Sequence, residues 1–212
     1  PASGAATPNP TPGKQKTISD DAPKGAEPPN EAGSPTALVT LEEFADFQCP
    51  QCAAKHPVMS EIKSLYGSRI RFIYRNYPLP QHDKSYPAAV AAEAAGLQGK
   101  FWEMHDLLYE NQKSWSDSSA NDRTDLFTQY AVNAGVEADT FTKTLTNKST
   151  QINRKIDFDR ALGSKVNVNA TPTFYLNGKK LEQNQYDSEE ALQKTLLSAF
   201  KDAGITSPQE TK

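Results

Sequence analysis

Both cysteines of the chain lie in the segment Phe47-Gln48-Cys49-Pro50-Gln51-Cys52, three positions apart. A strand-like apolar run precedes this segment and a helix-like run follows it. If the helix begins here, Cys49 lies in its first turn, where free backbone N–H groups and the helix dipole stabilise a thiolate. Pro50 fits this place, because a proline in the first turn loses no hydrogen bond. Cys52 then lies one turn later on the same face, within reach of a disulfide.

The spacing of the two cysteines favours redox chemistry over a structural role. Thiol-disulfide exchange needs a sulfur that is open to attack and a leaving thiolate of low pKa, and Cys49 at a helix start meets both needs. The alternative is a structural disulfide or an idle pair of thiols. A bond between Cys49 and Cys52 would close so short a loop that it removes little chain entropy, so we favour a redox-active pair.

The beginning of the chain differs in composition from the rest of its 212 residues. Residues 1–36 contain eight of the fifteen prolines and four glycines, no aromatic residue, and Ile18 as the one large aliphatic side chain. Such a segment cannot bury enough apolar surface to offset the entropy of ordering it. We therefore predict a disordered proline-rich linker over 1–36, one domain over 37–203 and a tail over 204–212.

The charge and the N-terminal composition restrict the partners and the location. The net charge of −3, with acidic and basic residues intermixed, argues against binding to nucleic acid. No apolar run approaches the roughly 18 residues that a membrane-spanning helix needs. A proline-rich segment ahead of a domain often follows a removed signal peptide or a membrane anchor. We therefore expect a periplasmic or other extracytoplasmic location, and the alternative is the ordinary tail of a cytosolic protein.

The predicted elements follow the order strand-helix-strand, helical block, strand-strand-helix. Strands are expected at 37–44, 69–75, 172–176 and 179–182. An Asn177-Gly178 pair joins the last two strands as a hairpin turn. The helical block, at approximately 84–165, is expected to contain helices at 88–97, 101–111, 122–133, 139–145 and 150–162. Gly163 is expected to mark the end of the last of these helices.

Four local patterns occur in a fixed order along residues 37–203. They are Glu43-Phe44-Ala45-Asp46 followed by Phe47-Gln48-Cys49-Pro50-Gln51-Cys52, Pro57 within the next helix, Gly99-Lys100-Phe101-Trp102-Glu103-Met104-His105, and Ala170-Thr171-Pro172-Thr173-Phe174 followed by Asn177-Gly178-Lys179. Together they make the chain resemble the DsbA-like thiol-disulfide oxidoreductases. The resemblance implies an α/β class, with a thioredoxin fold that carries an inserted all-helical subdomain.

The resemblance also implies roles for particular residues. Cys49 is similar to the exposed nucleophilic cysteine of these proteins and Cys52 to its buried resolving partner. Pro172 is similar to the cis-proline that faces the redox pair and, with Thr171 before it, presents backbone to the substrate chain. The dipeptide between the cysteines would contact substrate too, and Pro50-Gln51 here departs from strongly oxidising members, which have histidine at the second place. Gln51 carries no charge, so weaker stabilisation of the thiolate is expected.

Glu43 is similar in position to the acidic residue beneath the redox pair. Its strand neighbours Val39 and Leu41 share its face, so its carboxyl group is expected among apolar side chains, where its pKa rises. A carboxyl group of raised pKa could accept a proton from Cys52 and return it, through water. The alternative is a salt bridge to a neighbouring lysine.

The resemblance implies an oxidase that donates the Cys49–Cys52 disulfide to folding proteins, needs no cofactor beyond that disulfide, and works as a monomer. Its partners would be cysteine-containing proteins and a membrane reoxidant linked to quinone, of the DsbB or vitamin K epoxide reductase kind. A disulfide reductase and an isomerase remain open within the same fold. A metal-binding module with Cys49, Cys52 and His56 as ligands is a further alternative, although a second pair of ligands is missing. The last alternative is a binding or chaperone domain that has the same fold but catalyses no reaction.

Overall fold

The structure is a computed structural model that describes residues 30–205. Its strands are β1 (Asn30–Gly33), β2 (Val39–Ala45), β3 (Ile70–Asn76), β4 (Thr173–Leu176) and β5 (Lys179–Lys180). Its helices are α1 (Pro50–Tyr66), α2 (Ser85–Gly96), α3 (Phe101–Glu110), α4 (Gln112–Ser116), α5 (Ala120–Asn133), α6 (Ala138–Asn147), α7 (Ser149–Lys165) and α8 (Glu189–Asp202), with a 3₁₀ turn at Gln183–Gln185. No helix in this part of the chain is both long and apolar enough to cross a membrane.

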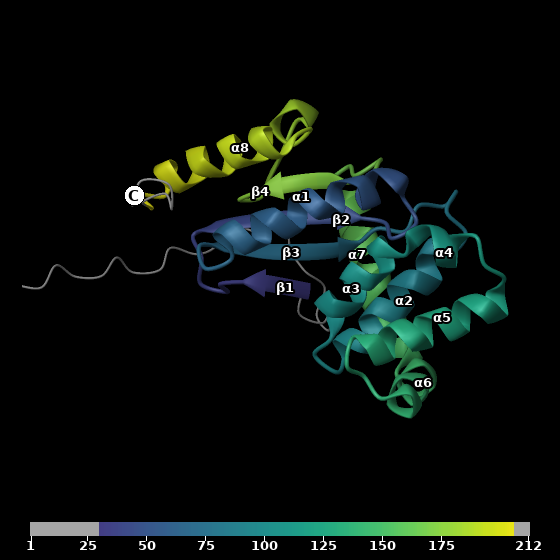
Figure 1. Cartoon of the computed structure of the whole chain (residues 1–212). Coiled ribbons are helices and arrows are strands. Elements are labelled where there is room, and N and C mark those ends of the chain that lie inside the picture. The colour runs from purple at the N-terminus through teal and green to yellow at the C-terminus, as the bar shows by residue number, and fades with distance from the viewer. Residues whose placement is uncertain (1–29, 206–212) are drawn as a thin grey trace, which may run out of the picture.

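The five strands form one mixed sheet in the order β1-β3-β2-β4-β5. Strand β2 lies in the middle, parallel to β3 and antiparallel to β4, and it leads directly into the segment that holds the cysteines. The helices from α2 to α6 gather on one side of the molecule and α8 lies on the other (Figure 1). The predicted thioredoxin fold with inserted helices is confirmed.

The two sides of β2 contact different helices. On one side Val39 and Leu41 pack with apolar residues of α1 and α8, and this cluster includes Met59 and Leu192. On the other side Phe44 packs with residues at the end of α7 and with β4. This alternation places consecutive side chains of β2 in two separate environments. The adjacent acidic residues Glu42 and Glu43 therefore lie on opposite faces of the sheet.

The predicted linker extends too far into the chain. Strand β1 lies inside the range 1–36, and it pairs antiparallel with β3. Glu31 explains why this segment is ordered, because its carboxylate pairs with Arg71 and its carbonyl accepts a hydrogen bond of 2.7 Å from Trp102 Nε1. These contacts are tertiary, and composition does not reveal them. The predictions for residues 1–29 and 206–212 lie outside the described residues.

Gly163 has a different role from the predicted one, since α7 continues past it to Lys165. A Cβ atom added at this glycine would lie 2.5 Å from a ring carbon of Tyr77 and 3.1 Å from one of Phe44. The glycine therefore allows α7 to approach the sheet closely. At the hairpin, by contrast, the predicted turn is present, with positive φ angles of 50° at Asn177 and 78° at Gly178.

Candidate redox site

The helix begins where the cysteine spacing predicts. Cys49 is the N-cap residue of α1, with extended φ and ψ angles of −70° and 121°, and Pro50 occupies the first turn. The Cys49 carbonyl accepts hydrogen bonds of 3.1 Å from the backbone N–H groups of Cys52 and Ala53, which closes the first helical turn. At this N-cap position the backbone N–H groups of Gln51 and Cys52 lie close enough to the Cys49 sulfur to stabilise a thiolate.

Cys49 is less accessible than its resemblance implied. The residue is 5% exposed and Cys52 is 1% exposed, and both are free thiols in this structure. The reason is the chain before β4, since the Cys49 thiol donates a hydrogen bond of 3.4 Å to the carbonyl of Thr171. Pro50 and Gln51 beside the pair are exposed. The prediction of an exposed nucleophile is thus wrong for the side chain of Cys49 in this structure.

The Thr171–Pro172 peptide is cis, as the resemblance implied. The Thr171 hydroxyl oxygen is buried and has no hydrogen-bond partner within residues 30–205, and it lies near enough to the Cys49 sulfur to influence its pKa. A hydroxyl group beside a thiolate can turn its hydrogen toward the charge. Thr171 therefore contributes both a carbonyl and a hydroxyl group to the surroundings of Cys49.

The two thiols have opposite acidities. The hydrogen bond from the Cys52 thiol, together with the Thr171 hydroxyl and the backbone N–H groups of Cys52 and Gln51, outweighs burial and lowers the pKa of Cys49 to about 5. Burial raises the pKa of Cys52 above its ordinary value, and its bond to the Cys49 sulfur raises it further. At neutral pH the reduced pair therefore holds one thiolate, on Cys49, and one proton, on Cys52.

Glu43 lies below this pair with its carboxyl group out of contact with solvent. The residue is 4% exposed, and burial raises the pKa of its carboxyl group to about 8, against the opposing charges of Lys63 and Lys55. Its negative charge in turn raises the pKa of Cys52. Within the described residues the Glu43 carboxyl group makes no hydrogen bond or ion pair, so the alternative of a direct salt bridge to a lysine is not met.

Sequence reasoning missed two residues that hold the redox segment in place. Gln112, at the start of α4, donates from its side-chain amide to the carbonyls of Phe47 (2.7 Å) and Cys49 (3.0 Å). Asp46 is 1% exposed, and its carboxylate accepts 2.8 Å bonds from the Leu79 backbone N–H and from His82 Nδ1. The sequence does contain a signal for Asp46, because a charged residue at the end of an apolar strand indicates a specific polar contact. Nothing local points to Gln112.

The structure does not bring together the ligands of the alternative metal module. In the described part of the chain, His56 lies with His105 and Asp106 instead of with the cysteines. His56 Nε2 lies 2.9 Å from Asp106 Oδ1, which draws the ring toward α3. A site made of Cys49, Cys52 and His56 is therefore wrong as a ligand set.

A family model described as thioredoxin matches residues 27–196. The chain belongs to the thioredoxin family. Within this family its fold is similar to oxidised BdbD of Bacillus subtilis, with a TM-score of 0.67, 23% identity, and 88% of this chain and 96% of BdbD covered. It is also similar to α-DsbA1 of Wolbachia pipientis, with a TM-score of 0.67, 21% identity, and coverage of 82% and 92%. These likenesses confirm the DsbA-like form of the thioredoxin fold.

Curated relatives match this thioredoxin-family chain over part of their own length. Na(+)/H(+) antiporter NhaA 1 of Mycolicibacterium gilvum is 34% identical over 151 residues, which is 70% of this chain and 23% of the antiporter. NhaA 3 of Salinispora tropica is 37% identical over 174 residues, which is 82% of this chain and 25% of that protein. The chain thus spans about a quarter of these relatives, and the antiporter name does not transfer to it.

Proposed function

We propose that the chain is a protein thiol-disulfide oxidoreductase and that it works as an oxidase. The observation that carries the proposal is the difference in pKa between the two thiols. The pKa is about 5 at Cys49 and is raised at Cys52. A stabilised Cys49 thiolate lowers the free energy of the reduced protein relative to the disulfide form, and this makes the disulfide a stronger oxidant. The DsbA-like fold supports the same reading.

The reaction begins from the Cys49–Cys52 disulfide. A substrate thiolate attacks Cys49 Sγ, the bond between the two sulfurs breaks, and Cys52 leaves as a thiolate. Because burial disfavours that charge, Cys52 takes up a proton at once, and the protonated Glu43 carboxyl group supplies it through water. The product of this step is a mixed disulfide between the substrate and Cys49.

A second substrate thiolate completes the exchange. It attacks the substrate sulfur of the mixed disulfide, and Cys49 leaves as the low-pKa thiolate that its surroundings stabilise. The substrate loses two electrons and gains a disulfide, while the redox pair gains the two electrons. Thr171 and Pro172 would position the substrate backbone, and the exposed Pro50 and Gln51 would contact it from the other side.

The exposed glutamine between the cysteines does not remove the oxidising character. Gln51 contributes through its backbone N–H, while its uncharged side chain makes no contact with the sulfur atoms within residues 30–205. The hydrogen bonds from Cys52 and Thr171 supply the stabilisation that histidine supplies as a charge in strongly oxidising relatives. The surroundings of Cys49 therefore support the proposed oxidase activity.

The remaining parts of the proposal concern location and partners. We place the oxidase outside the cytoplasm, where disulfides persist, with cysteine-containing proteins as substrates. A quinone-linked membrane protein of the DsbB or vitamin K epoxide reductase kind would accept the two electrons. We expect the oxidase to work as a monomer.

Redox titration of the protein against glutathione tests the proposal. We expect a potential less negative than about −200 mV, and a thiolate ultraviolet absorbance in the reduced protein that titrates near pH 5. Cys49→Ser should abolish this absorbance change, whereas Cys52→Ala should keep a Cys49 titration at higher pH because it removes the thiol that donates to the thiolate. A potential near the −270 mV of thioredoxin would replace the oxidase with a reductase.

A further inference from the structure

Three metal-ligating side chains converge at the contact between α1 and α3. His56 Nε2 lies 2.9 Å and His105 Nδ1 lies 2.8 Å from the same atom, Asp106 Oδ1. The two ring nitrogens and this oxygen all lie within 4.8 Å of one another. The redox reaction proposed above makes no use of this group.

Both imidazole rings are fixed by packing. His105 is 2% exposed, and its ring lies 4.9 Å from the ring of Tyr74 and 5.0 Å from that of Tyr109. His56 stacks on Tyr109, with ring centroids 5.4 Å apart, and its centroid lies 5.5 Å from that of His105. A cluster whose rings cannot turn away is pre-organised for a ligand, because little side-chain entropy remains to be lost on binding.

We propose that His56, His105 and Asp106 form a binding site for a divalent transition-metal ion of the Zn²⁺ class. Two imidazoles and one carboxylate are a donor set that suits zinc, and three protein ligands leave the fourth position to water. The Asp106 side chain is 37% exposed, so this position opens to solvent and gives the ion an entry path.

Binding of an ion needs the three ligand atoms, which lie within 4.8 Å of one another, to rearrange around it. Ligands at about 2.0–2.1 Å around a tetrahedral zinc ion lie about 3.3 Å apart, so each ring nitrogen has to withdraw from Asp106 Oδ1 by about 0.5 Å. In the present structure hydrogen bonds hold these atoms together. A neutral imidazole keeps one N–H, and on ion binding this hydrogen occupies the ring nitrogen that faces away from the ion.

Lys63 is a cation that lies next to the site. Its ammonium group lies 3.7 Å from Asp106 Oδ1, where it would repel an incoming ion. The same ammonium group lies 4.2 Å from the ring centroid of Trp102, on the side of an aromatic face that favours a cation. Binding of the ion therefore has to displace the Lys63 ammonium group from Asp106, and the Trp102 ring offers the displaced cation a second contact.

Calorimetric titration of the untagged, oxidised protein with Zn²⁺ tests the site. Oxidation locks Cys49 and Cys52 in a disulfide, so neither thiolate can act as a ligand. We expect one ion per chain, a higher unfolding temperature when Zn²⁺ is present, and a tetrahedral visible spectrum when Co²⁺ is used instead. Asp106→Asn keeps the size of the side chain and an oxygen acceptor but loses the charge, and it should weaken binding by about tenfold or more.

Two further variants complete the test. His56→Gln should weaken Zn²⁺ binding as Asp106→Asn does, and His82→Gln is the matched control because His82 lies at Asp46, away from the cluster. His82→Gln should bind Zn²⁺ as the wild type does. The proposal is overturned if the oxidised wild type binds no Zn²⁺ at about 0.1 mM, or if Asp106→Asn and His56→Gln bind it unchanged. It is also overturned if His82→Gln alone removes binding.

Discussion

Glu42 and Glu43 are adjacent in β2, yet their carboxyl groups lie on opposite faces of the sheet in opposite electrostatic environments. Glu42 is fully buried and accepts hydrogen bonds of 3.2 and 3.0 Å from the Nε and Nη2 atoms of Arg75. Glu43 is also buried, but within residues 30–205 it has no paired cation, and its pKa rises to about 8. The difference teaches that burial alone does not determine the pKa and the role of a carboxyl group. Whether a cation pairs with the buried carboxyl group is decisive.

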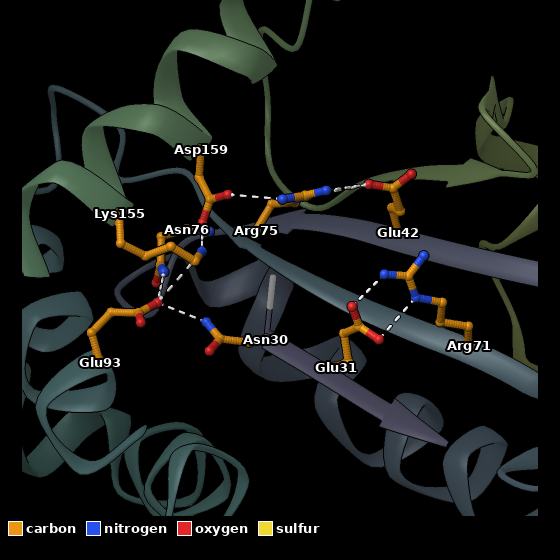
Figure 2. A network of polar contacts seen from close by, with 9 residues as sticks. All are labelled: Asn30, Glu31, Glu42, Arg71, Arg75, Asn76, Glu93, Lys155 and Asp159. Carbon is orange, nitrogen blue, oxygen red and sulfur yellow. Dashed lines mark hydrogen bonds and ion pairs between the residues drawn. The ribbon is translucent and has the colours of Figure 1, made fainter. Parts of the chain in front are cut away.

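The Glu42 face belongs to a continuous network between the sheet and the inserted helices (Figure 2). Arg75 reaches from Glu42 to Asp159 on α7, with Nη1 3.3 Å from Asp159 Oδ1. Asp159 also accepts a bond from Lys155, whose ammonium group lies 3.7 Å from Glu93 on α2. Alternating charges thus hold α2 and α7 to the sheet. On the opposite face, the Glu43 carboxyl group lies near the redox pair and makes no ion pair within residues 30–205.

The largest effect on stability is expected when the ion pairs of Arg75 are broken. Arg75→Met removes the cation between Glu42 and Asp159, and both carboxylates then lie in a region that excludes water. Removing one partner of a buried ion pair costs about 3–5 kcal/mol, because the other charge stays buried. We expect the free energy of unfolding, measured with urea, to fall by about this amount.

Arg71→Met is the matched control on the same strand. Arg71 pairs with Glu31 at the sheet edge, where the two side chains are 17% and 27% exposed. Solvent reaches this pair, so its loss should cost on the order of 1 kcal/mol. Equal losses for Arg75→Met and Arg71→Met would show that the buried network is no more important than an edge pair.

The second prediction concerns the pH dependence of stability that the Glu43 carboxyl group causes. The pKa of Glu43 is about 8 in the folded protein against an ordinary value of 4.5, so between these pH values the folded chain keeps a proton that the unfolded chain loses. The stabilising contribution of this proton is fully present below pH 4.5 and is lost as the pH rises through about 8. Its slope is at most about 1.4 kcal/mol per pH unit. Glu43→Gln should remove this slope in the oxidised protein.

Glu42→Gln serves as the comparison for this measurement. It weakens the pairing with Arg75 and should lower the free energy of unfolding at every pH, while the Glu43 slope between pH 4.5 and about 8 persists. Denaturant unfolding across the pH range gives both quantities. If Glu43→Gln kept the wild-type slope, the raised pKa of Glu43 would not be its source, and the proton transfer to Cys52 would lose its donor.

The periodicity of the sequence predicted most elements of the fold, because alternation and helical repeats are local. The predicted strands at 37–44 and 69–75 correspond to β2 and β3, and the helix start at Cys49 is confirmed. Strand β1 and helix α4 could not be predicted in this way. Both are short, and both are ordered by distant contacts, such as that of Trp102 with Glu31 and that of Gln112 with the redox segment.

The site was predictable as far as its motifs extend along the chain. Cys49, Cys52 and Pro172 lie in two short patterns, and the structure brings them together with a cis peptide before Pro172. Their catalytic roles stay predictions. The burial of Cys49 and the stabilising position of Gln112 depend on how segments far apart in sequence meet. The same holds for Lys63, whose effect on Glu43 crosses from α1 to β2.

The smallest effect is expected from changing the cations that act on Glu43 from a distance. Lys63 and then Lys55 are the charges that lower the pKa of this carboxyl group against burial. Lys63→Met removes the larger of the two while its side chain still packs on Trp102, so the pKa of Glu43 should rise by less than about one unit. Lys55→Met should shift it less. NMR titration of the Glu43 carboxyl carbon in the oxidised protein, with a chelator present, measures both shifts. A lower pKa in Lys63→Met would mean that solvent enters the pocket when the lysine is lost, and that burial, not the lysine charge, controls this acid.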